Sequence, residues 1–152
     1  MDSTDQRSTD PGTTDRSAAE GTSQELSTER CYELLATTTV GRVAFLGPDG
    51  IVLLPVNYRV VEGAIFLRTS PESALAALAD HDGEVVFEAD HHAQLARDGW
   101  SVVVRGTSGL VDDEQLLAAE ALHRLVPWPG GPRSWTLRIQ PHQVTGRHVH
   151  HA

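Results

Sequence analysis

The most constraining feature of this sequence is a pair of apolar, strand-like runs joined by the turn Glu62-Gly63. The runs are Ile51–Val61 and Ala64–Thr69, and this spacing is typical of a β-hairpin. Pro55 lies in the middle of the first run, and proline cannot donate a hydrogen bond to a neighbouring strand. We therefore expect this strand to lie at a sheet edge, to carry a bulge, or to split between two sheets near Pro55.

The other apolar runs also arrive as hairpins rather than as alternating strands and helices. We predict further strands over 40–46, 84–89, 100–111 and 135–139, with residues up to Val149 as a candidate continuation of the last. Gly106 and Gly109 mark bends or a bulge, and the polar segment 90–99 is expected to form a loop. About six mostly antiparallel strands favour a small closed or partly closed barrel over a doubly wound sheet.

Three short helices are predicted between these strands. Ser27 is a suitable N-cap for the first, Ser70 with Pro71 begins the second, and the third spans 112–125. The residues expected to face the core are Cys31, Leu34 and Leu35 in the first helix and Leu75, Leu78 and Ala79 in the second.

Composition limits the classes of protein that this chain can represent. Residues 1–24 are rich in Ser, Thr, Asp and Gly, so we expect a disordered tail followed by one domain over 25–149. A net charge of −9 argues against non-specific binding to nucleic acid. Cys31 is the single cysteine, which suits a reducing cytoplasm, and no apolar run approaches the roughly 20 residues of a membrane span. We expect a cytoplasmic protein.

Sequence motifs for catalysis or metal binding are absent. The chain has no GxSxG, GxGxxG or Walker A sequence, and no His–carboxylate pair at an interpretable spacing. The adjacent His91 and His92 would point to opposite faces of a strand, and no cysteine or carboxylate pattern completes a site with them or with the C-terminal histidines. The sequence therefore predicts no metal site and identifies no catalytic residue.

One junction could bind an anion. Arg68-Thr69-Ser70 leads directly into a predicted helix start, with Ser73 in its first turn. Free backbone amides, hydroxyl groups and an arginine are the groups that a phosphate site needs. An ordinary helix cap beside a surface arginine is the alternative.

Four blocks, in this order, resemble the pyridoxamine 5'-phosphate oxidase-like, flavin-binding split barrels, and in particular their short actinobacterial members. The blocks are VGRVAFLGPDGIVLLPVNYRVVEGAIFLRT, EVVFEAD, GWSVVVRGTSGLV and the closing WTLRIQPHQVTGR, which together cover roughly Leu26 to Arg147. The resemblance implies a mainly β, antiparallel split barrel. It also implies a homodimer that holds FMN between its subunits and acts as an oxidoreductase on a small-molecule substrate.

The resemblance assigns candidate cofactor-binding residues. The residues that would run along the isoalloxazine ring are Pro55, Val56, Asn57 and Tyr58, and those that would reach the ribityl phosphate are Arg68, Thr69 and Ser73. Trp100 and Arg105 would lie on a strand that lines the pocket or the dimer interface. Packing in the core or between subunits is the alternative for Trp100, as it is for Trp128 and Trp135.

The chain departs from the family pattern at Ser73-Ala74, where family members commonly carry a lysine that contacts the phosphate. Losing one charge-assisted contact costs roughly 1.5–3 kcal/mol. Two alternatives therefore stay open beside FMN. One is a deazaflavin-dependent reductase, whose coenzyme has an acidic tail that would seek Arg59, Arg68 and Arg105. The other is a non-enzymatic, stress-related dimer; relatives also include haem binders and proteins that hold no cofactor tightly.

Overall fold

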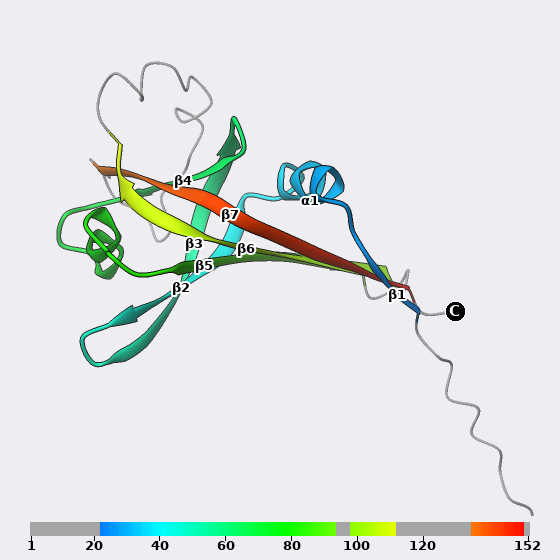
Figure 1. Cartoon of the computed structure of the whole chain (residues 1–152), viewed down its shortest axis with the longest axis horizontal. Helices are drawn as coiled ribbons and strands as arrows, with labels where there is room; N and C mark the ends of the chain where they lie inside the picture. Colours follow the sequence, from blue (N-terminus) through cyan, green and yellow to red (C-terminus); the bar gives the residue numbers. More distant parts are fainter. Residues whose placement is uncertain (1–21, 94–97, 112–134, 151–152) are drawn as a thin grey trace, which may run out of the picture.

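The computed structural model describes residues 22–93, 98–111 and 135–150 (Figure 1). The described chain is mostly strand. Its elements are β1 (Thr22–Glu25), α1 (Thr28–Leu35), β2 (Val40–Gly47), β3 (Gly50–Val61), β4 (Ala64–Thr69), the 3₁₀ helix η1 (Ala74–Ala79), β5 (Val85–Ala93), β6 (Asp98–Leu110) and β7 (Trp135–His150). None of the helices in this part of the chain has the length and apolar character that a bilayer crossing requires.

The strands form one antiparallel sheet that closes on itself. Its order is β1-β7-β4-β3-β2-β5-β6, and an additional pairing between β6 and β7 completes the ring. β1 pairs with β7 and adds a short strand outside that ring. The prediction of a mainly β, antiparallel split barrel is therefore confirmed, with β1 as a strand that the sequence did not indicate.

Strand β3 changes its partner in the middle, and this is the split in the barrel. It pairs with β2 from Gly50 to Asn57, where Pro55 lies opposite Arg42, and with β4 from Tyr58 to Val61. Of the three possibilities for Pro55, the structure shows a local sheet edge: at this residue β3 pairs with β2 alone, and the strand does not split between two sheets because all strands belong to one sheet. The proline lies where β4 offers no paired residue, so its missing N–H costs no ladder hydrogen bond on that side.

Helix α1 covers one end of the inner face of the sheet. The Ser27 hydroxyl accepts a hydrogen bond from the Arg30 amide at 3.2 Å, which confirms the predicted N-cap. Cys31, Leu34 and Leu35 are buried as predicted, and burial raises the pKa of the Cys31 thiol. The helix packs so closely on β7 that a Cβ at Gly146 would lie 2.6 Å from the Cys31 sulfur.

The core fills the inside of the barrel with alternate residues of each strand. Tyr58 lies at its centre, fully buried and edge-on to Phe87 with ring centroids 4.7 Å apart. The Tyr58 hydroxyl donates a 2.6 Å hydrogen bond to the Leu35 carbonyl at the end of α1. This one side chain therefore joins β3, β5 and α1.

Two expectations about loops and helices were wrong. The segment 90–99 is not a loop throughout, because the β5–β6 ladder continues from Asp90 opposite Ser101 to Ala93 opposite Asp98. Ser70 does not cap a helix: the chain turns first, and Ser73 precedes η1, which has 3₁₀ geometry. Leu78 is buried and Leu75 and Ala79 pack partly against the core, so the predicted apolar stripe is correct.

Some expectations fall at the limits of the described residues. β1 includes Thr22, Ser23 and Gln24, which the sequence placed in the tail, because their backbones pair with β7. The rest of that tail, the predicted helix 112–125 and Trp128 lie outside the described residues.

Candidate functional site

The split in the barrel brings together the two segments that sequence analysis singled out. Tyr58 lies opposite Leu67, so the stretch that ends at Asn57 runs alongside the Arg68 end of β4. The chain then turns through Ser70 into η1. Pro55–Tyr58, Arg68-Thr69 and Ser73 are therefore neighbours in the fold.

The residues of β3 at the split divide between two faces. The side chains of Val56 and Tyr58 are 3% and 0% exposed and belong to the core. Pro55 is exposed and Asn57 half-buried on the outer face. A ligand on this outer face would meet the Pro55 ring, the Asn57 amide and the backbone, because Val56 and Tyr58 point inward. Burial raises the pKa of Tyr58, so its phenol stays neutral.

Arg68 and Thr69 also face opposite sides of β4. Arg68 is half-buried on the outer face, opposite Thr136 of β7. Thr69 is 1% exposed, and its hydroxyl shares a hydrogen bond with the Ser73 hydroxyl. This bond closes the turn between β4 and η1, so the two hydroxyls stabilise the turn beside Arg68.

Two of the backbone amides at the start of η1 are hydrogen-bonded within the chain. The Ser73 amide donates to the Ser70 carbonyl at 3.1 Å, and the Ala76 amide donates to the Ser73 carbonyl at 3.0 Å. A tight turn followed by a short 3₁₀ helix uses these amides internally. An anion here would depend mainly on the Arg68 guanidinium and the turn backbone.

Trp100 and Arg105 lie away from the split in the barrel. Both are on β6, but Trp100 is 9% exposed on the inner face, whereas Arg105 is exposed. The Trp100 ring lies 6.5 Å from that of His91. The Arg105 Nε donates to Glu84 at 3.0 Å, and this contact lowers the pKa of the Glu84 carboxyl. Within one chain, β2 and β5 separate these residues from the split.

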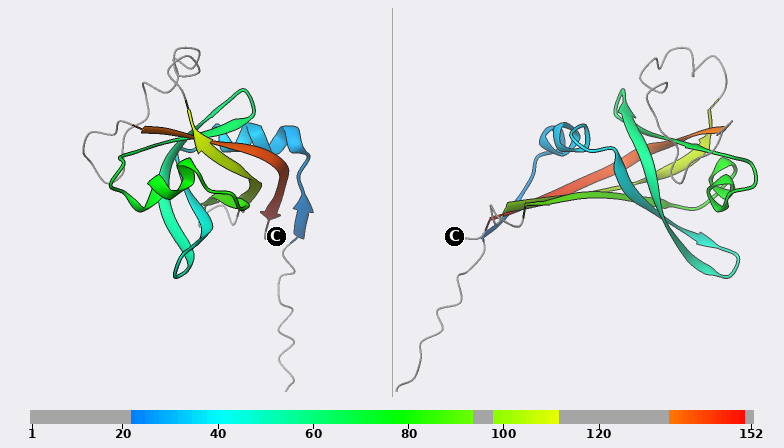
Figure 2. Two further views of the ribbon diagram at one scale, coloured as in Figure 1. Left: turned by 60° about the vertical axis from the view of Figure 1, so that its left-hand side comes forward. Right: turned by 180° about the vertical axis from the view of Figure 1, so that it is seen from behind.

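An exposed apolar surface adjoins Pro55. On the β2–β3 hairpin, Leu46 lies opposite Ile51 and Ala44 opposite Leu53. Leu46, Ile51 and Leu53 are 67%, 81% and 63% exposed. This hairpin extends beyond the rest of the sheet (Figure 2). Because directly opposed residues share a face, these side chains form one patch, which we call the hairpin face: Ala44, Leu46, Ile51, Leu53 and Pro55.

Sequence analysis missed the hairpin face, although a signal was present. The run IVLLPV is apolar at successive positions rather than at alternate ones. Continuous apolar runs are typical of strands that are covered on both faces. The inner residues of the run contact the core, and in this single chain Leu53 remains exposed.

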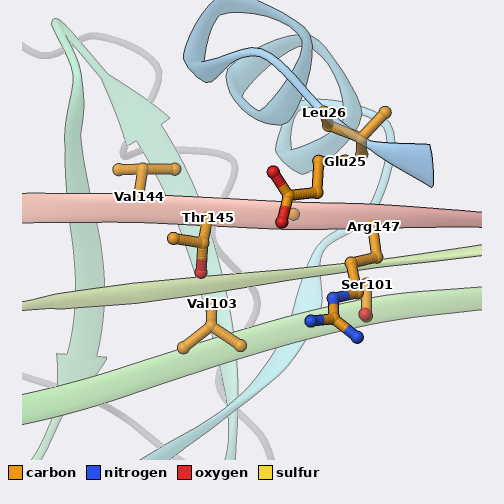
Figure 3. Close-up of a pocket in the computed structure, with 8 residues that line it drawn as sticks. Glu25, Leu26, Ser101, Val103, Val144, Thr145 and Arg147 are labelled. Carbon is orange, nitrogen blue, oxygen red and sulfur yellow. The ribbon is translucent and has the colours of Figure 1, made fainter. Parts of the chain in front are cut away.

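A separate pocket of about 320 Å³ lies where β1, β6 and β7 meet. The Arg147 guanidinium lies beside Ser101, with Thr145 and Val103 further along the strands (Figure 3). Glu25 of β1 is opposite Arg147 in the register. Sequence analysis did not indicate this pocket, because its lining comes from β1 and from the ends of two long strands.

Elsewhere in the described chain, contacts between charged or polar side chains link neighbouring strands. The Asp98 carboxylate lies 2.7 Å from His148 Nε2 and 3.5 Å from His150 Nδ1, and these contacts join the ends of β6 and β7. Arg42 pairs with Glu88 at 2.7 Å and with Asp90, and the hydrogen bond that Arg42 donates to the Glu88 carboxylate raises the pKa of Arg42. Among the described residues, no three His, Cys, Asp or Glu side chains converge as metal ligands.

Comparison with known proteins gives this geometry a family context. The family model described as "Pyridoxamine 5'-phosphate oxidase" matches residues 27–148. An uncharacterised protein of Mycobacterium tuberculosis is 35% identical over 127 residues, which are 80% of this chain and 82% of that protein.

Solved structures share the fold. A putative pyridoxamine 5'-phosphate oxidase from Corynebacterium glutamicum is 31% identical with a TM-score of 0.69, covering 86% of this chain and 95% of that one. The FAD binding protein from Mycobacterium smegmatis is 28% identical with a TM-score of 0.65, covering 84% and 98%.

Proposed function

The chain belongs to the pyridoxamine 5'-phosphate oxidase family, and we propose that it binds a flavin at the split in its barrel and acts as an oxidoreductase. The coenzyme that we propose is FMN. The substrate is a small molecule, and residues 25–149 form the functional domain. A similar structure that is named as an FAD binding protein supports the flavin class.

One observation carries the proposal: the change of partner along β3. From Pro55 to Asn57 the strand pairs with β2 on one side, and β4 offers no opposed residue on the other. Backbone groups on that side are available to the polar edge of a planar ring. The Tyr58 side chain holds the backbone of this stretch in place. Its ring packs edge-on against Phe87, and its hydroxyl donates a hydrogen bond to the Leu35 carbonyl at the end of α1.

Arg68 gives the site its charge. It lies at the end of β4, beside Asn57 and on the same outer face. A guanidinium suits a phosphate because its planar fork can donate two hydrogen bonds. The Thr69–Ser73 hydrogen bond holds the turn that follows, so Arg68 projects from a fixed backbone. Arg68 would therefore bind the ribityl phosphate in the absence of the family lysine.

A flavin, when bound, supplies the redox chemistry, and the protein contributes position and shelter from water. Pro55 and Asn57 would hold the ring against the backbone of β3. The hairpin face would exclude water when a second subunit covers it. No side chain is required as an acid or base, which agrees with the lack of a catalytic motif in the sequence.

The hairpin face is also the reason for proposing a homodimer. Exposed apolar patches on soluble proteins often mark interaction sites. This patch is continuous with Pro55, so a second subunit placed here would border the flavin. Trp100 or Arg105 of that subunit would then be able to line the site that they do not reach within one chain.

Titration of FMN into coenzyme-stripped protein tests the proposal, with Arg68→Ala in parallel. We expect binding in the micromolar range or tighter, and a loss of about tenfold or more in the variant. The deazaflavin coenzyme is titrated as a comparison. Failure of a folded, dimeric protein to bind either coenzyme would contradict the proposal and leave a non-enzymatic dimer.

A further inference from the structure

Strand β7 has a gap along one of its two edges. The other edge pairs with β6 over 137–150, so β4 and β1 both lie along the same, opposite edge. β4 pairs with β7 as far as Ile139, and β1 pairs with it from Arg147 onward. Among the described strands, none pairs with residues 140–146 on that edge. The pocket of about 320 Å³ lies at this gap, and residues 144–146 line it.

Two opposite charges line this pocket without forming an ion pair. Glu25 of β1 lies directly opposite Arg147 of β7, and opposed residues share a face of the sheet, where opposite charges attract each other. The Arg147 guanidinium nevertheless points towards Ser101 of β6 and not towards the Glu25 carboxylate (Figure 3). Within the described part of the chain, neither side chain has an ion pair or a hydrogen bond. Both charges are therefore available to a ligand.

The charged side chain that follows in the same row of the sheet does not neutralise Arg147. The row of Arg147 and Ser101 continues to Asp90 of β5. Asp90 pairs with Arg42, which also pairs with Glu88. Arg147 is therefore the cation of the pocket, and Glu25 is its anion.

The rest of the lining provides hydroxyl groups and apolar surface. The hydroxyls of Ser101 and Thr145 can donate to a carboxylate or accept from an ammonium group. Apolar side chains come from Leu26, Val103 and Val144. A volume of about 320 Å³ is at the lower end of the range of roughly 300–1,000 Å³ that is usual for ligand pockets. The pocket therefore suits a metabolite of amino-acid size.

We propose that this pocket binds a free α-amino acid with an apolar side chain. The Arg147 guanidinium would bind the carboxylate, because its planar fork can donate two hydrogen bonds. The Glu25 carboxylate would accept hydrogen bonds from the ammonium group. The amino acid would thus bridge two charges that do not pair with each other, and its side chain would lie against the apolar lining.

This site is separate from the proposed flavin site. β1 lies at one end of the molecule and the β2–β3 hairpin at the other (Figure 1). The pocket shares no lining residue with the split in the barrel. The inference therefore goes beyond the flavin function and does not depend on it.

Calorimetric titration of L-leucine into the full chain tests the proposal. Leucinamide lacks the carboxylate and N-acetyl-leucine lacks the ammonium charge, so each derivative removes one of the two charged contacts. The variants are Arg147→Gln and Glu25→Gln. Arg30→Gln and Glu33→Gln are the matched controls, because they remove the same charges from an exposed ion pair on α1. Thermal melting checks that each variant is folded, and the two derivatives decide the question if a pocket variant is not.

We expect L-leucine to bind with a Kd of about 1 mM or tighter. Each derivative and each pocket variant should weaken binding by about fivefold or more, while the controls stay within about twofold of wild type. Hydrogen exchange in the presence of L-leucine should slow in peptides that cover residues 22–26, 101–103 and 144–147, and should not change over 53–58 and 68–73.

Three results would overturn the amino-acid site. They are no binding of L-leucine by folded wild-type protein, equal binding of L-leucine and its two derivatives, and equal affinity of the pocket variants and the controls. Each of these results leaves the FMN titration, and with it the proposed function, unaffected.

Discussion

Tyr58 shows how one residue can support a site without touching its ligand. Its position in the sequence, beside Asn57, suggests a contact with the coenzyme. In the fold its ring is fully buried against Phe87, and its hydroxyl hydrogen-bonds the last carbonyl of α1. What Tyr58 would offer to a ligand is therefore a fixed backbone rather than a phenol.

Replacing Tyr58 by Phe should lower the free energy of unfolding by about 1–3 kcal/mol, because the buried Leu35 carbonyl loses its donor. Burial raises the pKa of Tyr58, so the folded chain keeps a proton that an unfolded tyrosine loses above about pH 10. Wild-type stability should thus fall as the pH rises through that range. The difference between the two proteins should shrink there, as measured by urea unfolding at pH 8 and pH 11. A constant difference would contradict this account.

At the scale of elements, the β6–β7 pair holds the barrel closed, and it contains a bulge. The register shifts between Arg105 and Gly106, as the glycine in the sequence suggested. A Cβ at Gly106 would overlap the carbonyl oxygen of Gln140 on β7. The close approach of the two backbones therefore requires glycine at this position.

Gly106→Ala should destabilise the fold by about 1–3 kcal/mol, because the strands must separate to admit the methyl group. Gly109→Ala is the matched control on the same strand, since a Cβ there would meet nothing within 4 Å. The control should be neutral or slightly stabilising. Thermal unfolding of both variants checks this, and equal melting temperatures would show that the bulge tolerates a side chain.

The elements that the sequence predicted correctly are those with a clear apolar pattern. The Ile51–Thr69 hairpin was predicted from two apolar runs joined by Glu62-Gly63, and α1 from the apolar face formed by Cys31, Leu34 and Leu35. The end of β5 was missed because His91, His92 and Asp90 are polar and exposed, so a ladder there has no apolar period. The start of η1 was misplaced because Ser70-Pro71 suits a turn as well as a helix start.

For the candidate site, sequence analysis predicted which segments lie side by side, but not the face of the sheet to which each side chain points. Pro55, Asn57 and Arg68 meet on one face, whereas Val56, Tyr58 and Thr69 point the other way. The position of Arg68 opposite Thr136 depends on the pairing of β4 with β7, and those residues are far apart in the chain. No local pattern contains that pairing, so sequence analysis could not predict it.

At the scale of the whole molecule, the hairpin face should be the dimer interface. Leu53→Asp would place a charge at its centre and should convert the dimer to a monomer, with little change in the secondary structure. Leu110→Asp is the matched control, because Leu110 is 51% exposed on β6, outside this patch. Light scattering during gel filtration measures both. A dimeric Leu53 variant, or a monomeric wild type, would contradict the assignment.

The central claim is that a flavin binds where β3 changes partner, and hydrogen exchange with and without FMN tests it most directly. Amides in peptides that cover residues 53–58 and 68–73 should exchange more slowly when FMN is bound. Peptides from the pocket at β1, β6 and β7 should not change. Protection confined to that pocket, or none in the β3 and β4 peptides at saturating FMN, would contradict the account.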